Sequence, residues 1–184
     1  MLFCAAACDP NRNDDAGDAD ASTGEVADEE TDLAVLAACD ENDLNTPPFM
    51  GPAFDPETGA LLEPLPEGHI VATTAGWSRA DEAARQLLGD HSNLVIVDLM
   101  THEGLLGATF GESEGCGSAR TLTIWRDEAS LVKFAAGPVH VTAIREALDA
   151  TRAWETTHWT GVAGAEAPTW DEARARLAAV RVSR

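Results

Sequence analysis

Basic residues are scarce in this chain, above all near the N-terminus. The 184 residues include 12 Lys or Arg against 32 Asp or Glu, a formal net charge of −20. Residues 1–68 hold 17 of the acids and one Arg, net −16, which leaves −4 for residues 69–184. Nucleic acid and anionic lipid head groups require positive surface, so we predict no nucleic-acid partner. We interpret the acidic run as a solvated segment, with recruitment of cationic partners or calcium as the alternative.

Signatures of several enzyme classes are also missing. The sequence contains no HExxH, no CxxC pair, no glycine-rich phosphate loop and no GxSxG. Zinc hydrolase, nucleotide-binding and serine hydrolase activities therefore have no support from motifs. We predict no metal site.

The first eight residues, MLFCAAAC, resemble the end of a bacterial lipoprotein signal, in which small residues precede a cysteine that becomes lipidated. A basic n-region and an apolar stretch of about 7–15 residues are missing. We therefore expect that the true start lies upstream, that residues 1–8 are a signal remnant, and that Cys8 anchors the protein to the bacterial cell envelope, in the periplasm or at the surface. The membrane would then be contacted only through this lipid. The alternative is a cytoplasmic protein whose N-terminus has no such role.

Residues 9–68 form an acidic, proline-rich stretch ahead of the domain. Residues 9–32 have few large apolar groups and cannot bury enough surface to offset the entropy of ordering. Residues 33–38 make a short apolar patch, and residues 45–66 carry six prolines, which favours an extended, irregular path. We expect a tether, disordered or irregular, with the folded domain spanning residues 69–184.

The cysteines allow one structural prediction. If Cys4 is removed with the signal and Cys8 is lipidated, Cys39 and Cys116 remain, and an exported protein keeps thiols oxidised. A bond between them would attach the proline-rich stretch to a loop of the domain and close a loop of roughly 77 residues, which stabilises by about 4 kcal/mol in the chain-entropy model. The alternative is two unpaired thiols in a cytosolic protein.

The domain reads as strands and helices in a definite order. We predict strands at residues 69–74, 105–110, 121–125 and 154–160; the first and the last two of these alternate with period two. Ser78 is a candidate N-cap for a helix from residue 80, and Asp127 for a second helical segment that Gly137-Pro138 divides. Thr169 is expected to cap a C-terminal helix reaching Val180.

The stretch NLVIVDLM, residues 93–100, fits either a strand or a buried helix, because periodicity cannot separate the two. If residues 80–102 are helical, with a break near Gly89-Asp90 allowed, the order is β-α-β-β-α-β. We therefore predict an α+β fold, with a ferredoxin-like antiparallel sheet and an added C-terminal helix. The apolar alternation on both sides of residues 122–125 leaves more surface than one helix layer covers, which favours a homodimer.

Three segments carry a family resemblance: GLLGATF, then TLTIWRDEASLVKFAAGPVHVTAIR, then THW. In this order they resemble the dimeric α+β barrel superfamily, specifically an uncharacterised branch of the antibiotic-biosynthesis-monooxygenase-like group. The resemblance spans residues 69–182. It implies two ferredoxin-like protomers whose sheets pack into a barrel, with a pocket between each sheet and its own helices. It also implies a small apolar or aromatic ligand.

Haem-degrading members of that superfamily use a Trp and an iron-binding His on the helix and an Asn on the first strand. The two helix positions fall here on Phe134 and Ile144, and the first strand offers no Asn. The resemblance therefore implies no haem, and we predict no cofactor.

Cofactor-independent members oxidise quinol-type substrates in a pocket of aromatic and polar groups. The candidates here are His140 and His158 as catalytic bases, since imidazole titrates near neutral pH. Substrate-binding candidates are Trp125, Phe134, Trp154 and Trp159. His140 could instead hydrogen-bond across the helix break. The resemblance implies oxidation of a small aromatic or quinol substrate; the alternative is a non-catalytic small-molecule-binding or structural lipoprotein module.

Overall fold

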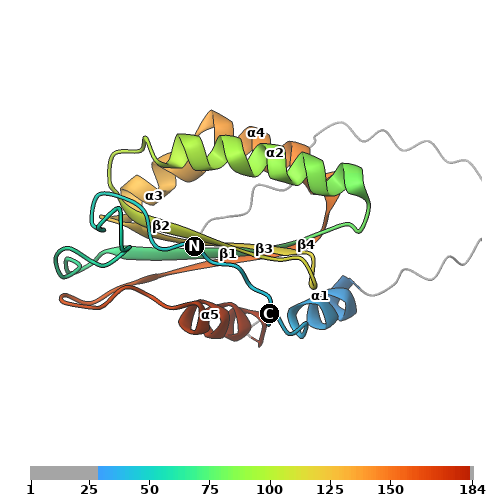
Figure 1. Cartoon of the computed structure of the whole chain (residues 1–184), viewed down its shortest axis with the longest axis horizontal. Coiled ribbons are helices and arrows are strands. Elements are labelled where there is room, and N and C mark those ends of the chain that lie inside the picture. Colours follow the sequence, from blue (N-terminus) through green and yellow to red (C-terminus); the bar gives the residue numbers. More distant parts are fainter. Residues whose placement is uncertain (1–28, 183–184) are drawn as a thin grey trace, which may run out of the picture.

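The computed structural model describes residues 29–182, which form one four-stranded sheet with helical segments on both faces (Figure 1). The elements, in order, are α1 (Glu29–Ala37), β1 (Ile70–Ser78), α2 (Glu82–Leu99), β2 (Leu105–Ser113), β3 (Ser118–Trp125), α3 (Glu128–Ala135), α4 (Pro138–Ala147), the 3-10 turn η1 (Leu148–Ala150), β4 (Thr151–Thr160) and α5 (Trp170–Val182).

The sheet has the strand order β2-β3-β1-β4, with every neighbouring pair antiparallel. Thr73 at the middle of β1 pairs with Leu122 of β3 on one side and with Thr157 of β4 on the other. This order, with α2 between β1 and β2 and α3–α4 between β3 and β4, confirms the predicted ferredoxin-like fold.

The ambiguous stretch 93–100 lies in α2, a single helix that passes through Gly89 without a break. Its N-cap is Asp81, whose Oδ1 accepts a hydrogen bond from the Ala84 amide at 2.9 Å, so the prediction of Ser78 as the cap is wrong. Ser78 ends β1 instead and donates its hydroxyl to the Gly117 carbonyl. The strand runs longer than predicted because Ile70–Trp77 have partners on both sides and Ser78 pairs with Thr151 of β4.

The other helix boundaries follow their predicted signals. Asp127 accepts from the Ser130 amide at 2.8 Å and begins α3. Pro138 occupies the first turn of α4, where its missing N–H costs nothing, and Gly137 precedes it. Thr169 accepts from the Glu172 amide at 3.2 Å and begins α5. Two abutting helices therefore replace a straight one, as the sequence predicts.

The two faces of the sheet are covered differently. On the helix side lie α2, α3 and α4; on the opposite side lie α1, α5 and residues 40–68, here named the arm (Figure 1). The arm also runs along the outer edge of β2, where Met50 and Ala108 exchange backbone hydrogen bonds of 2.8 and 2.7 Å. Asn45 and Glu112 do the same. The structured part therefore extends further toward the N-terminus than the predicted start near His69.

The sequence predicts a homodimer because one helix layer would leave the second face of the sheet uncovered. In the structure, the arm and α5 cover that face. Val71 and Leu122 of the sheet pack there against Ala173 of α5, and Ile124 packs against Phe54 and Leu65 of the arm. The chain itself buries the apolar surface that one helix layer leaves open.

Covalent and ionic contacts hold the arm side together. Cys39 and Cys116 form a disulfide with a Cα–Cα distance of 5.9 Å, the pairing that the sequence predicts. Two residues further on, the Glu41 carboxylate accepts from Arg120 Nε of β3 at 2.7 Å, and both side chains are 5% exposed. Arg181 of α5 likewise pairs with Glu155 of β4 at 2.6 Å.

Candidate functional site

Three of the predicted site residues meet at one end of the helix side. The Phe134 ring lies 5.2 Å from Trp125 and 4.7 Å from His140, measured between ring centroids. Trp125 is fully buried, and its indole N–H donates to Thr123 Oγ1 at 2.9 Å. The end of β3 and the α3–α4 junction bring these rings together.

Two residues from α2 and the turn after it complete this cluster. The His102 ring meets Phe134 edge-on at 5.2 Å, and His102 Nε2 lies 3.2 Å from a carboxylate oxygen of Asp98. Phe134 is therefore flanked by two imidazoles, one of them paired with a carboxylate. We call Asp98, His102, Trp125, Phe134 and His140 the histidine–aromatic cluster.

The hydrogen bonds of the cluster leave one basic nitrogen on each imidazole. His140 Nδ1 donates to the Ala135 carbonyl at 3.1 Å, so its Nε2 carries the lone pair. If His102 Nε2 donates to Asp98, His102 Nδ1 carries the lone pair. Burial lowers the pKa of His140; the Ala135 hydrogen bond and the nearby Asp98 carboxylate oppose this shift. A neutral imidazole at neutral pH has the form that a general base requires.

Core side chains pack around the buried part of the cluster. Ile70, Leu99, Leu105 and Ala108 form one buried core with Trp125 and Phe134, and Val95, Phe110 and Leu131 pack against it. His102 and Asp98 remain partly exposed, with 17% and 26% of their side chains accessible. The cluster therefore reaches the surface at its His102–Asp98 end.

The remaining predicted site residues lie elsewhere. Trp159 packs on the opposite face of the sheet with Val71 and Leu122, so the prediction that it lines the same pocket as Trp125 is wrong. His158 points to the helix side but is exposed, and Trp154 is 49% exposed at the far end of β4, opposite Gly76. Alternation along β4 separates Trp159 from its neighbour, as the period of a strand requires.

Sequence reasoning assigned no role to Asp98 or His102. Their spacing of four residues at the end of a helical stretch is the signal that could have indicated a pair, because such residues lie on one face of a helix. That signal depended on recognising residues 93–100 as helical. His69, which is buried and contacts the Pro66 carbonyl through Nδ1 at 2.6 Å, was likewise not singled out.

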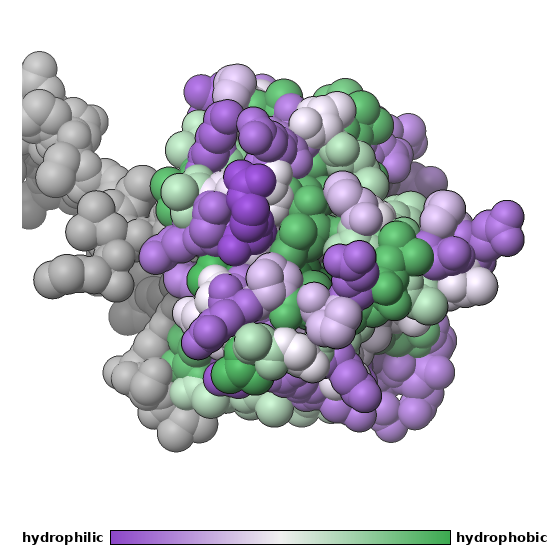
Figure 2. Space-filling model, turned by 90° about the vertical axis from the view of Figure 1, so that its left-hand side faces the viewer, coloured by the Kyte–Doolittle hydropathy of each residue, from purple (hydrophilic) through white to green (hydrophobic). Residues whose placement is uncertain are grey.

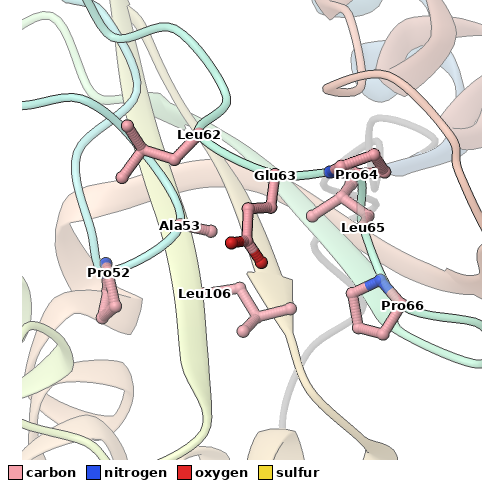
Figure 3. A pocket seen from close by; sticks show the side chains of 8 residues that line it. All are labelled: Pro52, Ala53, Leu62, Glu63, Pro64, Leu65, Pro66 and Leu106. Carbon is pink, nitrogen blue, oxygen red and sulfur yellow. The ribbon is translucent and has the colours of Figure 1, made fainter.

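Two cavities lie on the arm side rather than beside the cluster. The larger, about 370 Å³, is lined by the arm and Leu106 of β2 (Figure 3). The smaller, about 160 Å³, lies between β4, the loop after it and α5, and His69 and Arg176 are among its lining residues. Arg176 also lies over the Trp159 ring at 5.0 Å.

Apolar side chains reach the surface of the helix layer. Leu94 and Val97 of α2 are 60% and 68% exposed, and Ile144 of α4 is 43% exposed. At the end of the molecule seen in Figure 2, apolar residues likewise alternate with polar ones at the surface. The high acidity of the whole chain therefore does not produce a uniformly polar exterior.

Among residues 29–182, no group of three or more His, Cys, Asp or Glu is arranged to hold a metal ion. No helix in this part of the chain is long and apolar enough to cross a membrane. The predicted lipid-anchored Cys8 lies outside the described residues.

Comparison with known proteins gives structural matches only. No family profile matches the sequence, and no curated protein matches it significantly. Solved structures with a similar arrangement include a provisionally assigned monooxygenase from Fusobacterium nucleatum, with 9% identity, a TM-score of 0.46, and coverage of 54% of this chain and 44% of that one. A cofactor-independent oxygenase from Streptomyces nogalater has 12% identity, a TM-score of 0.44, and coverage of 51% and 93%.

A protein from Shewanella oneidensis gives 13% identity, a TM-score of 0.48, and coverage of 53% and 94%. The present chain thus spans less than half of the Fusobacterium protein. At such identities and TM-scores the matches carry no information about activity, substrate or assembly.

Proposed function

We propose that the histidine–aromatic cluster is a general-base site, and that the domain oxidises a small aromatic or quinol substrate without a cofactor. The observation that carries this proposal is the placement of two imidazoles on either side of Phe134, with Asp98 3.2 Å from one of them. Burial favours the neutral, basic form of His140. An aromatic substrate at the rim formed by His102 and Asp98 would offer its acidic proton to an imidazole.

The chemistry needs only a base and dioxygen. Removal of a proton from an activated CH₂ or hydroxyl group makes the substrate electron-rich enough to reduce O₂. For a substrate written RH₂, the balance is RH₂ + O₂ → R=O + H₂O, in which one oxygen atom enters the product and the other becomes water. The chain supplies proton transfer and orientation, the contributions that general bases make.

Oxygen consumption with a panel of quinols and polyphenols tests the proposal. His102→Gln and His140→Gln should each lower kcat/KM by about a hundredfold, within the usual range for loss of a general base. His91→Gln is the matched control, because His91 also pairs with a carboxylate, Glu146 at 3.3 Å, but lies outside the cluster. Turnover of no panel member, or equal losses in all three variants, would contradict the proposal.

A second candidate is a non-catalytic module, and one observation favours it. The space between the sheet and its helices is occupied by the core around Trp125 and Phe134. This candidate predicts that aromatic compounds bind or fail to bind without any oxygen consumption. The same assay, run beside a binding titration, separates the two.

We further propose that the chain is tethered to the bacterial cell envelope through a lipid on Cys8. The MLFCAAAC sequence supports this, and so does the Cys39–Cys116 disulfide, since such bonds persist in oxidising compartments. Mass spectrometry of the protein from its native host should find a diacylglyceryl group on Cys8. An unmodified Cys8 would exclude the anchor.

We also propose that two copies associate through β4 rather than through a sheet face. Within residues 29–182, β4 has a hydrogen-bonded strand neighbour on one side only, whereas the arm lies along the opposite edge of the sheet. Leu148 and Trp154, both 49% exposed, lie at or just before this edge. Unpaired edges of this kind favour strand addition. Sedimentation at micromolar concentration should show a dimer, and Trp154→Lys should weaken it; a strict monomer would refute association.

A further inference from the structure

The larger cavity has a composition that suits one kind of ligand. Its lining side chains are apolar except for a single carboxylate, and the cavity is open to solvent because most of its lining residues are exposed. The lining residues are Pro52, Ala53, Leu62, Glu63, Pro64, Leu65, Pro66 and Leu106. Figure 3 shows the Glu63 side chain extending between the Pro52–Ala53 wall and the Leu65–Pro66 wall, with its carboxylate above Leu106. The volume, about 370 Å³, is within the range of small-molecule sites.

The walls of this cavity are fixed before any ligand arrives. Ala53 donates to the Leu106 carbonyl at 2.9 Å, and Leu62 donates to the Ala53 carbonyl at 2.9 Å. Phe54, next to the cavity, stacks on Phe49 with centroids 4.7 Å apart, and Leu65 is buried. Three prolines restrict the backbone further. Binding would therefore cost little ordering entropy.

Glu63 has no cationic partner among residues 29–182. Residues 29–68 contain no Lys or Arg, and none of the cavity-lining residues is basic. No hydrogen bond or ion pair joins Glu63 to another residue in the described part of the chain. Glu63 is exposed, so water hydrates its carboxylate in the free protein and the carboxylate is accessible to a cation. The net charge of −20 attracts cations to this surface.

We propose that this cavity binds a small organic ammonium compound: a primary amine attached to an apolar group about the size of a phenyl ring. The ammonium would pair with the Glu63 carboxylate, and the apolar group would contact the leucine and proline walls. The cavity lies on the arm side of the sheet, opposite the histidine–aromatic cluster, so this site is independent of the proposed oxidation.

Nuclear magnetic resonance titration of the full chain tests the proposal with three matched probes: phenethylamine, phenethyl alcohol and phenylacetate. Phenethylamine should shift the backbone amides of Ala53, Leu62, Leu65 and Leu106 and bind most tightly; phenylacetate should bind least. Glu63→Gln should weaken phenethylamine at least about fivefold, the effect expected for one partly exposed ion pair. The same variant should leave the alcohol unchanged.

The control is Glu57→Gln, which removes an exposed carboxylate from the same arm outside the cavity. Two results would overturn the proposal: equal binding of the amine and the alcohol, or equal weakening by Glu57→Gln and Glu63→Gln. The second would mean general attraction to an acidic surface. A lysine amide that binds in preference to phenethylamine would also overturn it, because the site would then recognise a protein side chain.

Discussion

The two faces of the sheet are covered by segments that are connected to it in different ways. On the helix side, each covering helix connects two strands of the sheet directly, so short connections hold Trp125, Leu99 and Phe134 together. On the arm side, the covering segments come from the two ends of the described chain, and Leu36 packs with Leu177. That face relies on a disulfide across 77 residues and on the buried Glu41–Arg120 pair.

The comparison shows that the stability of the arm side depends on contacts between residues far apart in the sequence. Segments joined by short connections lose little entropy when they pack, whereas closing a long loop costs more and needs additional interactions. We therefore expect the arm side to open before the helix side. The following changes test that expectation, in order of decreasing effect.

The largest effect should come from breaking the disulfide. Cys39→Ser combined with Cys116→Ser should lower the free energy of unfolding by about 4 kcal/mol, the loop-closure value for this separation. Hydrogen exchange should then become faster at arm amides such as Met50 and Ala53, with less change in α2 and α4. A uniform acceleration over both faces would contradict independent opening. Denaturant unfolding provides the stability measurement.

A smaller effect should follow loss of the Glu41 charge. Glu41→Gln leaves Arg120 buried without its counter-charge, and breaking a buried pair from one side costs about 3 kcal/mol. Glu57→Gln, at an exposed position on the same arm, should change stability by less than about 0.5 kcal/mol. Chemical denaturation of both variants gives the comparison. Equal changes in the free energy of unfolding for the two variants would show that the buried Glu41–Arg120 pair contributes no more stability than an exposed carboxylate.

The smallest effect concerns pH and the helix side. Burial lowers the pKa of His140 below the ordinary 6.5, so the unfolded chain takes up a proton at pH values where the folded chain does not. The contribution of His140 to the free energy of unfolding is therefore constant above pH 6.5 and becomes less favourable as the pH drops toward the pKa of the folded state. The free energy of unfolding of the wild type, relative to His140→Gln, should decrease from pH 7.5 to 5.5. An increase in this relative free energy of unfolding from pH 7.5 to 5.5 would contradict the conclusion that burial lowers the pKa of His140.

Local signals in the sequence account for the helix side. Asp127 marked a helix start, Gly137-Pro138 marked a helix break, and the turn residues after Phe110 marked a hairpin. Each of these effects acts over a few residues, which is why it could be read from the chain. The Ser78 cap failed because pairing with Thr151 of β4 and hydrogen bonds to the Gly117 carbonyl keep that residue in β1.

The candidate site was predictable only in part. Trp125, Phe134 and His140 were selected as site residues and lie in contact, whereas Asp98 and His102 depended on the assignment of α2. Trp159 was selected as well, but strand alternation turns it to the other face. Glu63 could not be selected as a site residue, because the cavity that it lines forms only when the arm folds onto β2.

The sequence by itself determined the order of strands and helices and the cysteine pair that could bond, because these depend on residue type and on spacing along the chain. Only the tertiary structure decided that the chain covers the second face of its own sheet, and that the exposed Glu63 side chain lines a cavity between the arm and β2. Both outcomes require residues far apart in sequence to meet, and the apolar surface buried in such contacts is set by the packing of the whole fold.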